Sequence, residues 1–478
     1  MKANKFYTKR TKIVGTIGPA TSTMATIERL IQAGMNIARL NLSHGSYEEH
    51  ARLIKDIRNL SQCMGIDMAI LMDLPGTKYR IGKLKSEKVI LPKGSQVTLT
   101  SRQVPGDALL LPVSLPNLAH YAKAGDTILL SDGAIQLKVQ QKAGNEVICR
   151  VEAGGTLTEG RGLVVPGMRT SLPFLNDRLR EYIRFAARQQ PDYLALSFIS
   201  HADEISQVRT ILSSLGADIP IIAKIERGQA VDNFDGILAV SDGIMVARGD
   251  LGVDIPLERV PLVQKVIIQK CNQAGKPVIT ATEMLESMVT SARPTRAEVT
   301  DVANAIFDGT DATMLSAETA IGKHPVAAVK MMAKIAREVE NKLPYERMLT
   351  QRSGWLERKT DELIGYNACH TAHSLGAVAI VAFTASGSTA GRVSKYRPQV
   401  PIIALTPSST VARRLVLRWG VYPAQIPGVT SVDELFTAGA RTCRDLGLVK
   451  PGDLIVITGG IPIGITGSTN LLKVEQIT

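Results

Sequence analysis

A lysine and a glutamate stand two residues apart at the end of an apolar segment. Lys224 and Glu226 belong to the run Ile-Ile-Ala-Lys-Ile-Glu that starts at Ile221. Alternate side chains of a β-strand project from the same face, so these two would place a cation and a carboxylate in one pocket. Taken alone, the pair is as consistent with an ordinary ion pair as with a functional site.

A second carboxylate, Asp250, follows another apolar segment and lies between Gly249 and Gly252. Glycine lets the backbone approach a ligand closely, and free amide groups beside it can face an anion. Glu226 and Asp250 would together suit Mg²⁺ or Mn²⁺, because Mg²⁺ often takes one or two carboxylates and leaves its other positions to water and substrate oxygens. The plainer alternative is a glycine turn with a capping aspartate.

Arg39, Asn41 and Ser43 occupy alternate positions in the run Arg-Leu-Asn-Leu-Ser-His-Gly, which again predicts that they face the same way. The guanidinium of Arg39 offers a fork of donors to a phosphate, whereas the amide and hydroxyl oxygens suit a hard cation or a nucleotide phosphate. Thr282 adds a hydroxyl group at the end of a further apolar run. A threonine in that position is, on its own, more often structural.

These residues follow short apolar runs that alternate with amphipathic segments of helical length, from 12 to 74 and from 192 to 317. This alternation is typical of a parallel sheet whose strands are joined by helices. Eight such units approach the ~250 residues of a (β/α)8 TIM barrel, in which the loops at the carboxyl ends of the strands carry the chemistry. The predicted strands are Ile13–Ile17, Asn36–Asn41, Ala69–Asp73, Tyr193–Phe198, Pro220–Ile225, Gly243–Ala247, Pro277–Ala281 and Ala312–Leu315.

Two further domains are expected, because 478 residues exceed the ~250–300 at which a single core stops growing. Helical periodicity vanishes between residues 75 and 169, where alternating runs and the hairpin signal Asp132-Gly133 predict a small β-barrel domain. Inserted after the third barrel strand, it would overhang the barrel mouth as a lid that excludes water. The predicted α/β fold thus has a barrel (1–74 and 170–345), a lid domain (75–169) and a C-terminal α/β domain (346–478).

Composition argues for a globular protein that binds small anions. Hydrophobic residues make up 45% and charged residues 21%, and the net charge of +12 favours anionic ligands. Nucleic acid is a poor candidate, because no long basic block occurs and aromatic residues, at 4%, offer few surfaces for base stacking. The longest apolar run, 375–383, is too short to span a membrane, and the start of the chain has no secretory signal, so we expect a cytoplasmic protein.

The five cysteines are widely spaced and are expected to be reduced thiols. His370 and His373 beside Cys369 suggest zinc only superficially, because a fourth ligand is lacking. Pro294-Thr295 is expected to begin a helix at Arg296.

Taken together, the motifs resemble those of the pyruvate kinase family, bacterial type, over essentially the whole chain. The resemblance rests on six segments in the family's order: Asn41 to Gly45, Ile221 to Glu226, Val246 to Gly252, Thr282 to Met288, Pro294 to Glu298, and Met314 to Thr319. It implies transfer of the phosphoryl group of phosphoenolpyruvate to ADP, giving pyruvate and ATP in glycolysis, with Mg²⁺ or Mn²⁺. Such transfer needs positioning and charge neutralisation more than covalent chemistry.

The resemblance also implies roles for individual residues. Lys224, Thr282 and Arg39 would be catalytic: Lys224 stabilises the moving phosphoryl group and the enolate oxygen, Arg39 contacts the phosphate, and Thr282, through water, helps to deliver the proton. Glu226 and Asp250 would bind the metal. The remaining implied residues are Gly249, Asp250, Thr282 and Ser316 for the substrate, and Asn41, Ser43, His44, Arg80 and Arg161 for the nucleotide, Arg161 replacing the lysine usual in the family.

The chain departs from the family at the site where many relatives bind potassium. That region corresponds to Asn41, Ser43, Asp73, Leu74 and Lys78, where Leu74 replaces a threonine and Lys78 stands in place of a glutamate. An ammonium is a monovalent cation, so Lys78 is expected to substitute for potassium, which places the chain in a potassium-independent subgroup. The alternative is that Lys78 is a solvated surface residue. Glu283 replaces the family's glutamine, with no effect that the sequence predicts.

In the C-terminal domain, a loop of small polar residues between a strand and a helix resembles the family's effector loop. Its members are Thr384, Ser386, Gly387, Ser388 and Thr389. Such a helix start suits a phosphate, so a phosphorylated allosteric effector is expected, a sugar monophosphate or AMP; the alternative is a capped helix without a ligand. The resemblance also suggests a homotetramer. Competing functions are another Mg²⁺-dependent phosphoenolpyruvate or pyruvate barrel enzyme, a lyase or aldolase, and a basic nucleic-acid-binding protein.

Overall fold

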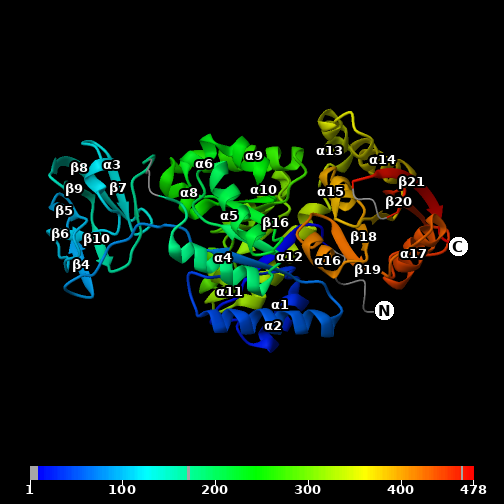
Figure 1. The fold of residues 1–478 in the computed structure, drawn as a ribbon, viewed down its shortest axis with the longest axis horizontal. Helices are drawn as coiled ribbons and strands as arrows, with labels where there is room; N and C mark the ends of the chain where they lie inside the picture. The colour runs from blue at the N-terminus through cyan, green and yellow to red at the C-terminus, as the bar shows by residue number, and fades with distance from the viewer. Residues whose placement is uncertain (1–8, 169–172, 464–466) are drawn as a thin grey trace.

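The computed structural model describes residues 9–168, 173–463 and 467–478. Its elements lie in three groups along the long axis of the molecule: an all-β group, a central barrel with outer helices, and an α/β group that carries the C-terminus (Figure 1). The predicted boundary at residues 169 and 170 lies outside the described residues.

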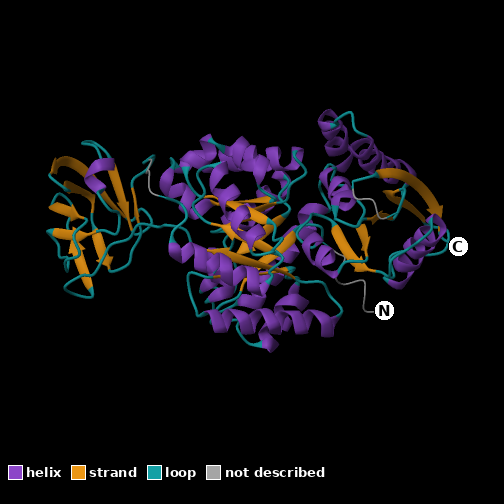
Figure 2. Ribbon diagram, in the orientation of Figure 1, coloured by secondary structure: helices purple, strands orange, loops and turns teal. Residues whose placement is uncertain are grey.

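The central group is a closed barrel of eight parallel strands with helices around it (Figure 2). The strand order around the barrel is β1-β16-β15-β14-β13-β12-β3-β2, and all eight predicted strands are present. The predicted (β/α)8 barrel, the main part of the fold class, is therefore confirmed. The strands are β1 (Lys12–Thr16), β2 (Ile37–Asn41), β3 (Ala69–Leu74), β12 (Tyr193–Leu196), β13 (Ile221–Ile225), β14 (Gly243–Ala247), β15 (Val278–Ala281) and β16 (Ala312–Leu315).

Both faces of the barrel strands are covered, which is why they read as continuous apolar runs. All five residues of β13, Lys224 included, are buried. The principal outer helices are α1 (Met24–Ala33), α2 (Tyr47–Met64), α4 (Asp177–Gln189), α5 (Ala202–Ser214), α9 (Val260–Gln273), α10 (Arg296–Asp308) and α12 (Pro325–Glu340). Thr295 and Glu298 form a capping box at the start of α10, so the prediction that a helix begins there is confirmed.

The insert is an all-β unit around its own core, but its strands do not form the single small barrel that was expected. They form a six-stranded sheet, β11-β7-β8-β9-β5-β6, and a two-stranded sheet, β10-β4. The Asp132-Gly133 signal is confirmed, since these residues connect the antiparallel strands β7 and β8 with positive φ values of 55° and 91°. The elements are β4 (Lys88–Leu91), β5 (Gln96–Thr100), β6 (Leu110–Pro112), α3 (Leu118–Tyr121), β7 (Thr127–Leu130), β8 (Ile135–Ala143), β9 (Glu146–Ala153), β10 (Gly155–Thr158) and β11 (Leu163–Val164).

The C-terminal group is a five-stranded sheet of order β19-β18-β17-β20-β21 with helices around it. Its elements are α13 (Tyr345–Arg352), α14 (Thr360–Leu375), β17 (Ala379–Phe383), α15 (Ser388–Lys395), β18 (Ile402–Thr406), α16 (Ser409–Leu415), β19 (Val421–Gln425), α17 (Val432–Asp445), β20 (Leu454–Gly460) and β21 (Thr469–Gln476). His370 and His373 are exposed on α14, whereas Cys369 is buried and donates a hydrogen bond to the carbonyl of Val393.

The C-terminal group closes the amino ends of the barrel strands. Val416 and Leu417 pack in the same core as Val14 and Met314 of the barrel interior. The ammonium of Lys12, at the start of β1, donates to the carbonyl of Val421 at 2.6 Å. The carboxyl ends of the strands therefore face the insert (Figure 1).

A second contact at this junction is ionic. The guanidinium of Arg397 binds both carboxylate oxygens of Asp311, at 2.8 and 3.0 Å, and both side chains are buried. Asp311 directly precedes β16, so the pair ties the C-terminal group to the start of a barrel strand.

All five cysteines are free, and only Cys63 of these is exposed. Among the described residues, no helix is both long and apolar enough to cross a lipid bilayer.

Candidate active site

Lys224 lies at the centre of a buried polar cluster at the carboxyl ends of the barrel strands. Its ammonium donates to Ser197 Oγ at 2.7 Å and contacts Asp73 Oδ1 at 3.3 Å and Glu226 Oε1 at 2.9 Å. Burial alone would lower the pKa of Lys224, but the charges of Asp73 and Glu226 outweigh it and raise the pKa above its usual value. Lys224 is therefore held as a cation with little access to water.

Arg39 joins this cluster from β2. Its Nε donates to Asp73 Oδ2 at 2.8 Å, and its Nη1 donates to Thr16 Oγ1 at 2.9 Å. Burial opposes the charge of Asp73, but the cations Lys224 and Arg39 prevail and hold the pKa of that carboxyl below its usual value. The two predicted catalytic cations thus share one ionised aspartate.

The two predicted metal ligands lie at neighbouring strand ends and line one cavity between the barrel and the insert. Glu226 is buried and accepts a hydrogen bond from the amide of Phe198 at 2.6 Å. Burial, and secondarily the negative charge of Asp250, raises the pKa of Glu226, although Lys224 opposes the shift. Asp250, in the first turn of α8 (Arg248–Asp254), is partly exposed.

This pair of carboxylates fits Mg²⁺ better than a metal that needs an all-protein cage. Among the described residues no group of three or more His, Cys, Asp or Glu side chains is arranged to hold a metal ion. Mg²⁺ usually keeps several water or substrate oxygens and binds through one or two carboxylates. Glu226 and Asp250 match that donor set.

The predicted substrate-binding residues Gly249, Thr282 and Ser316 follow the strands β14, β15 and β16. The amide of Gly249 donates to Thr282 Oγ1 at 2.8 Å, and that hydroxyl donates to the carbonyl of Ala281 at 2.6 Å. Ser316 directly follows β16, and its amide donates to Glu318 Oε2 at 2.7 Å. The structure thus joins Gly249 to Thr282 by a direct hydrogen bond and places Ser316 at a neighbouring strand end.

The predicted nucleotide residues fall into two groups. Asn41, Ser43 and His44 follow β2 on the barrel, where the amide of Ser43 donates to Asn41 Oδ1 at 3.2 Å. Arg80 and Arg161 line a polar hollow of the insert, which also includes Lys78 and Asp132. The structure does not bring the two groups into one cluster.

The ammonium of Lys78 is not where the resemblance to potassium-binding relatives would place it. Its ammonium pairs with Asp250 at 2.8 Å and with Asp132 of the insert at 3.3 Å, not with Asp73. Burial would lower the pKa of Lys78, but the two carboxylates raise it above its usual value. Lys78 is not the freely solvated side chain of the plainer alternative. Leu74 is completely buried.

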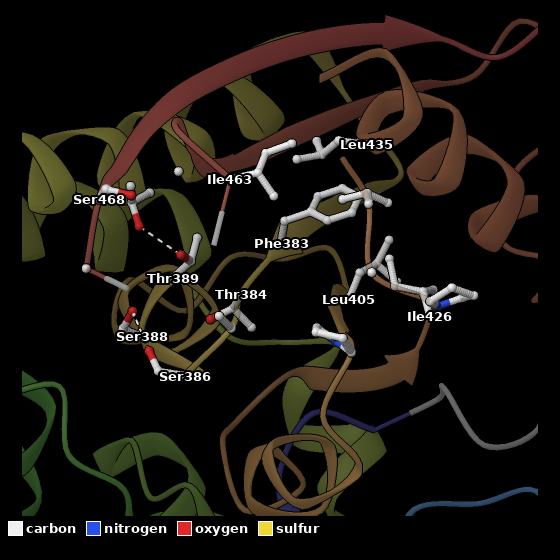
Figure 3. A pocket seen from close by; sticks show the side chains of 18 residues that line it. Phe383, Thr384, Ser386, Ser388, Thr389, Leu405, Ile426, Leu435, Ile463 and Ser468 are labelled. Atoms are coloured by element: carbon white, nitrogen blue, oxygen red, sulfur yellow. Dashed lines mark hydrogen bonds between the residues drawn. The ribbon is translucent and has the colours of Figure 1, made fainter. Parts of the chain in front are cut away.

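The predicted effector loop lines a separate cavity in the C-terminal group (Figure 3). Hydroxyl groups gather on one side of the cavity, and apolar side chains form the opposite wall (Figure 3). The hydroxyl side includes Thr384, Ser386, Ser388, Thr389 and Ser468, and the apolar wall includes Phe383, Leu405, Ile426, Leu435 and Ile463. None of the described residues that line this cavity carries a charge.

The loop itself turns at Gly387, whose φ is 91°. Its amide donates to Thr384 Oγ1 at 2.8 Å, and α15 begins at the next residue. The amino end of α15 therefore lies beside the hydroxyl side of the cavity.

Comparison with known proteins identifies the family. The family model described as pyruvate kinase, barrel domain, matches residues 8–329, and that described as pyruvate kinase, alpha/beta domain, matches residues 362–475. The chain is 46% identical to a pyruvate kinase of Geobacillus stearothermophilus, over 98% of this chain and 81% of that protein. It is 43% identical to one of Clostridium acetobutylicum, over 98% of this chain and 100% of that protein, and 45% identical to one of Staphylococcus aureus, over 98% and 80%.

The chain belongs to the pyruvate kinase family.

Membership of the pyruvate kinase family confirms the predicted function and the predicted class of enzyme, a phosphotransferase. The alternatives of a lyase or aldolase and of a nucleic-acid-binding protein find no support among these matches.

Two residues of the polar cluster escaped the sequence analysis. Ser197 follows β12 and binds Lys224, and Thr16 ends β1 and binds Arg39. Both are polar residues at the carboxyl end of a barrel strand, which is the signal that would have found them.

Proposed function

We propose that the chain transfers the phosphoryl group of phosphoenolpyruvate to ADP at the carboxyl ends of the barrel strands, with Lys224 as the principal catalytic residue. The supporting observation is the ammonium of Lys224, which is buried, charged and bound by Asp73, Ser197 and Glu226. A fixed positive charge in a water-poor site stabilises negative charge that develops on a transferring phosphoryl group and on the enolate oxygen.

The neighbouring residues would position the reactants. Arg39 would hold the phosphate of phosphoenolpyruvate, and Gly249, Asp250, Thr282 and Ser316 would surround the rest of the substrate. An oxygen of the ADP β-phosphate forms the new bond to phosphorus as the bond to the enol oxygen breaks. Protonation of the enolate at its terminal carbon then yields pyruvate.

Glu226 and Asp250 would hold Mg²⁺ or Mn²⁺, which when bound supplies positive charge to the phosphate oxygens. Lys78 would leave Asp250 when the metal binds, because both compete for that carboxylate. Asn41, Ser43 and His44 on the barrel, with Arg80 and Arg161 on the insert, would contact the nucleotide phosphates. Binding of the nucleotide between these two groups would draw the insert toward the barrel and exclude water.

Replacement of Lys224 by methionine tests the central assignment. Loss of a preorganised charge of this kind costs roughly a hundred- to a thousandfold in kcat, so pyruvate formation should fall by at least that factor. Ser197→Ala keeps the ammonium and removes one of its partners, so pyruvate formation by this variant should fall much less.

The measurement is pyruvate released from phosphoenolpyruvate and ADP, with circular dichroism to verify folding. Undiminished turnover of Lys224→Met would overturn the assignment.

We also propose that potassium is not required, as in the potassium-independent subgroup. Asp73, which belongs to the potassium region, already binds Arg39 and Lys224, and Lys78 brings an ammonium to the same end of the barrel. The cationic charge that potassium would contribute is thus present in the protein itself.

The cavity beside the effector loop would bind a phosphorylated effector, and its lining favours a nucleoside monophosphate such as AMP over a sugar phosphate. Amide and hydroxyl donors at the amino end of α15 suit a single phosphate. The uncharged lining gives no partner for a second phosphate, and the apolar wall suits a base better than sugar hydroxyl groups.

A cytoplasmic homotetramer completes the proposal. Large apolar side chains are exposed on neighbouring barrel elements, which favours their burial against another copy. They are Leu257 (71% exposed), Leu262 (64%), Val266 (52%) and Phe307 (50%).

A further inference from the structure

Thr282 and the residue after it adopt a backbone conformation that side chains rarely tolerate. The φ of Thr282 is 67° and that of Glu283 is 54°, so both lie in the left-handed region although neither is glycine. Two consecutive residues of this kind cost free energy and persist only where the surrounding structure holds them. Contacts from neighbouring residues must therefore hold the loop that follows β15 in this conformation.

Arg248 provides these contacts. Its Nη2 donates to the carbonyl of Thr282 at 2.7 Å and to the carbonyl of Glu283 at 3.2 Å, and its Nε contacts the carbonyl of Thr282 at 3.3 Å. The side chain is nine-tenths buried, and its Nη1 donates to Asp301 Oδ1 on α10 at 2.7 Å. One guanidinium thus binds the carbonyls of both strained residues and is itself held by a neighbouring helix.

The residue next to Arg248 holds Thr282 from the opposite end. The amide of Gly249 donates to Thr282 Oγ1 at 2.8 Å, while Arg248 binds the carbonyl oxygen of the same threonine. The first two residues of α8, which directly follows β14, therefore fix both the backbone and the side chain of Thr282. Asp250, the next residue again, is one of the two carboxylates of the metal pair.

We infer that Arg248 is a positioning residue for proton delivery, because it fixes the Thr282 hydroxyl relative to the reacting carbon. The inference rests on the role proposed for Thr282. Arg248 is not among the residues assigned to the substrate, and it contacts the backbone carbonyl of Thr282, not its hydroxyl. The rigid planar fork of an arginine reaches the two carbonyls through one nitrogen and Asp301 through another, whereas a lysine has a single nitrogen and could not keep all of these contacts.

The decisive readout separates proton delivery from phosphoryl transfer. In heavy water the enzyme would exchange the methyl protons of pyruvate for deuterium, and proton NMR follows this exchange. The assay therefore reports on proton delivery alone and does not depend on phosphoryl transfer. General acid–base catalysis typically contributes about a hundred- to ten-thousandfold, so Arg248→Met should slow the exchange by roughly a hundredfold. The affinity for phosphoenolpyruvate, measured by calorimetry, should change little, and Arg248→Lys should lie between.

Arg209→Met is the matched control, because Arg209 also binds a carbonyl and an aspartate, Val240 and Asp242, but at the amino end of β14, whereas Thr282 follows the carboxyl end of the parallel strand β15. It should leave the exchange unchanged. Thermal melting identifies any variant that fails to fold, and Arg248→Lys keeps the test available if Arg248→Met does fail.

A double-variant cycle distinguishes the possible failures. If Arg248 acts through Thr282, then Arg248→Lys combined with Thr282→Ala should exchange no more slowly than Thr282→Ala alone. The inference would be overturned if the two substitutions together slowed the exchange by the product of their separate factors. It would also be overturned by normal exchange in folded Arg248→Lys and Arg248→Met. Normal exchange in Thr282→Ala would instead overturn the role proposed for Thr282.

Discussion

Asp73 shows how single residues determine the charge of this site. A buried carboxyl group tends to be neutral, yet Asp73 stays ionised because Lys224 and Arg39 both contact it. The same carboxylate keeps Lys224 charged. The three groups therefore maintain one another's charges, and neutralising any one of them would alter the other two.

Whether potassium activates the enzyme also depends on single side chains. The wild-type enzyme should show nearly the same rate in potassium-free buffer and in potassium chloride, because Arg39 and Lys224 already neutralise Asp73 and Lys78 adds an ammonium beside Asp250. Lys78→Ala removes that ammonium, so it should acquire activation by potassium of about tenfold or more, the effect of losing one contact of a charged group.

The assay measures the initial rate against potassium, with sodium and tetramethylammonium chloride at matched ionic strength. Lys85→Ala is the control, because Lys85 lies on the insert and pairs with Asp107 away from the site. A large activation of the wild-type enzyme by potassium alone would contradict the prediction.

At this scale the sequence predicted the type of residue at the site better than its partners. Lys224, Glu226, Asp250 and Thr282 stand at or just after the ends of apolar runs, and the carboxyl ends of parallel strands meet at one end of the barrel. The partners of Lys78 were not predictable, because Asp132 lies on a hairpin whose position over the barrel depends on how the insert packs.

At the scale of elements, helix α15 and the loop before it determine what the C-terminal cavity can bind. The amino end of a helix presents free amide groups and a partial positive charge, while Phe383 and Ile426 contribute apolar surface opposite (Figure 3). The element thus combines a place for one anion with a place for an apolar group.

Two substitutions test the place for the anion and the place for the apolar group separately. Ser388→Asp places a carboxylate at the start of α15, where it suits the helix but repels a phosphate, so it should weaken binding of AMP and of ribose 5-phosphate alike. Ile426→Ser removes apolar surface from the partly exposed wall, so it should weaken binding of AMP by about tenfold and leave ribose 5-phosphate nearly unchanged.

Calorimetric titration of both ligands and of fructose 1,6-bisphosphate provides the measurement. Tightest binding by the bisphosphate would contradict the assignment, and the absence of binding by all three would favour a capped helix without a ligand.

Elements with a continuous apolar run or a regular apolar alternation were predictable, and those with neither were not. All eight barrel strands are buried on both faces and were found from the sequence. β19 includes Pro423 and has only two buried residues, and β21 carries Lys473 and Glu475 at the edge of its sheet. Neither has the continuous apolar run that reveals a central strand.

At the scale of the whole molecule, the junction between the barrel and the C-terminal group depends on buried charge. Arg397 and Asp311 are both buried, and the amide of Trp419 also donates to Asp311, at 3.1 Å. Removing one partner of a buried pair leaves the other charge without compensation, at a typical cost of about 3–5 kcal/mol.

Asp311→Asn should therefore lower the urea midpoint of unfolding. Trp419 lies over the Arg397 guanidinium, 5.1 Å from ring centroid to Cζ, so tryptophan fluorescence reports on this junction. Lys359→Ala, which removes an exposed pair with Glu357, should leave the midpoint unchanged. An unaltered midpoint in Asp311→Asn would show that the pair does not stabilise the junction.

The three-part organisation was predictable from changes in periodicity along the chain. The junction was not, because Arg397 and Asp311 are separated by 85 other residues and neither lies in a recognisable motif.

Val416 and Leu417 affect how segments of this enzyme can be exchanged with those of a relative. They supply the hydrophobic floor of a barrel whose walls come from the first two thirds of the chain. A chimaera that takes its last third from a relative inherits that relative's floor along with the relative's version of the C-terminal cavity. Compatibility between the two parents would have to be judged inside the catalytic barrel as well as at the seam between the exchanged segments.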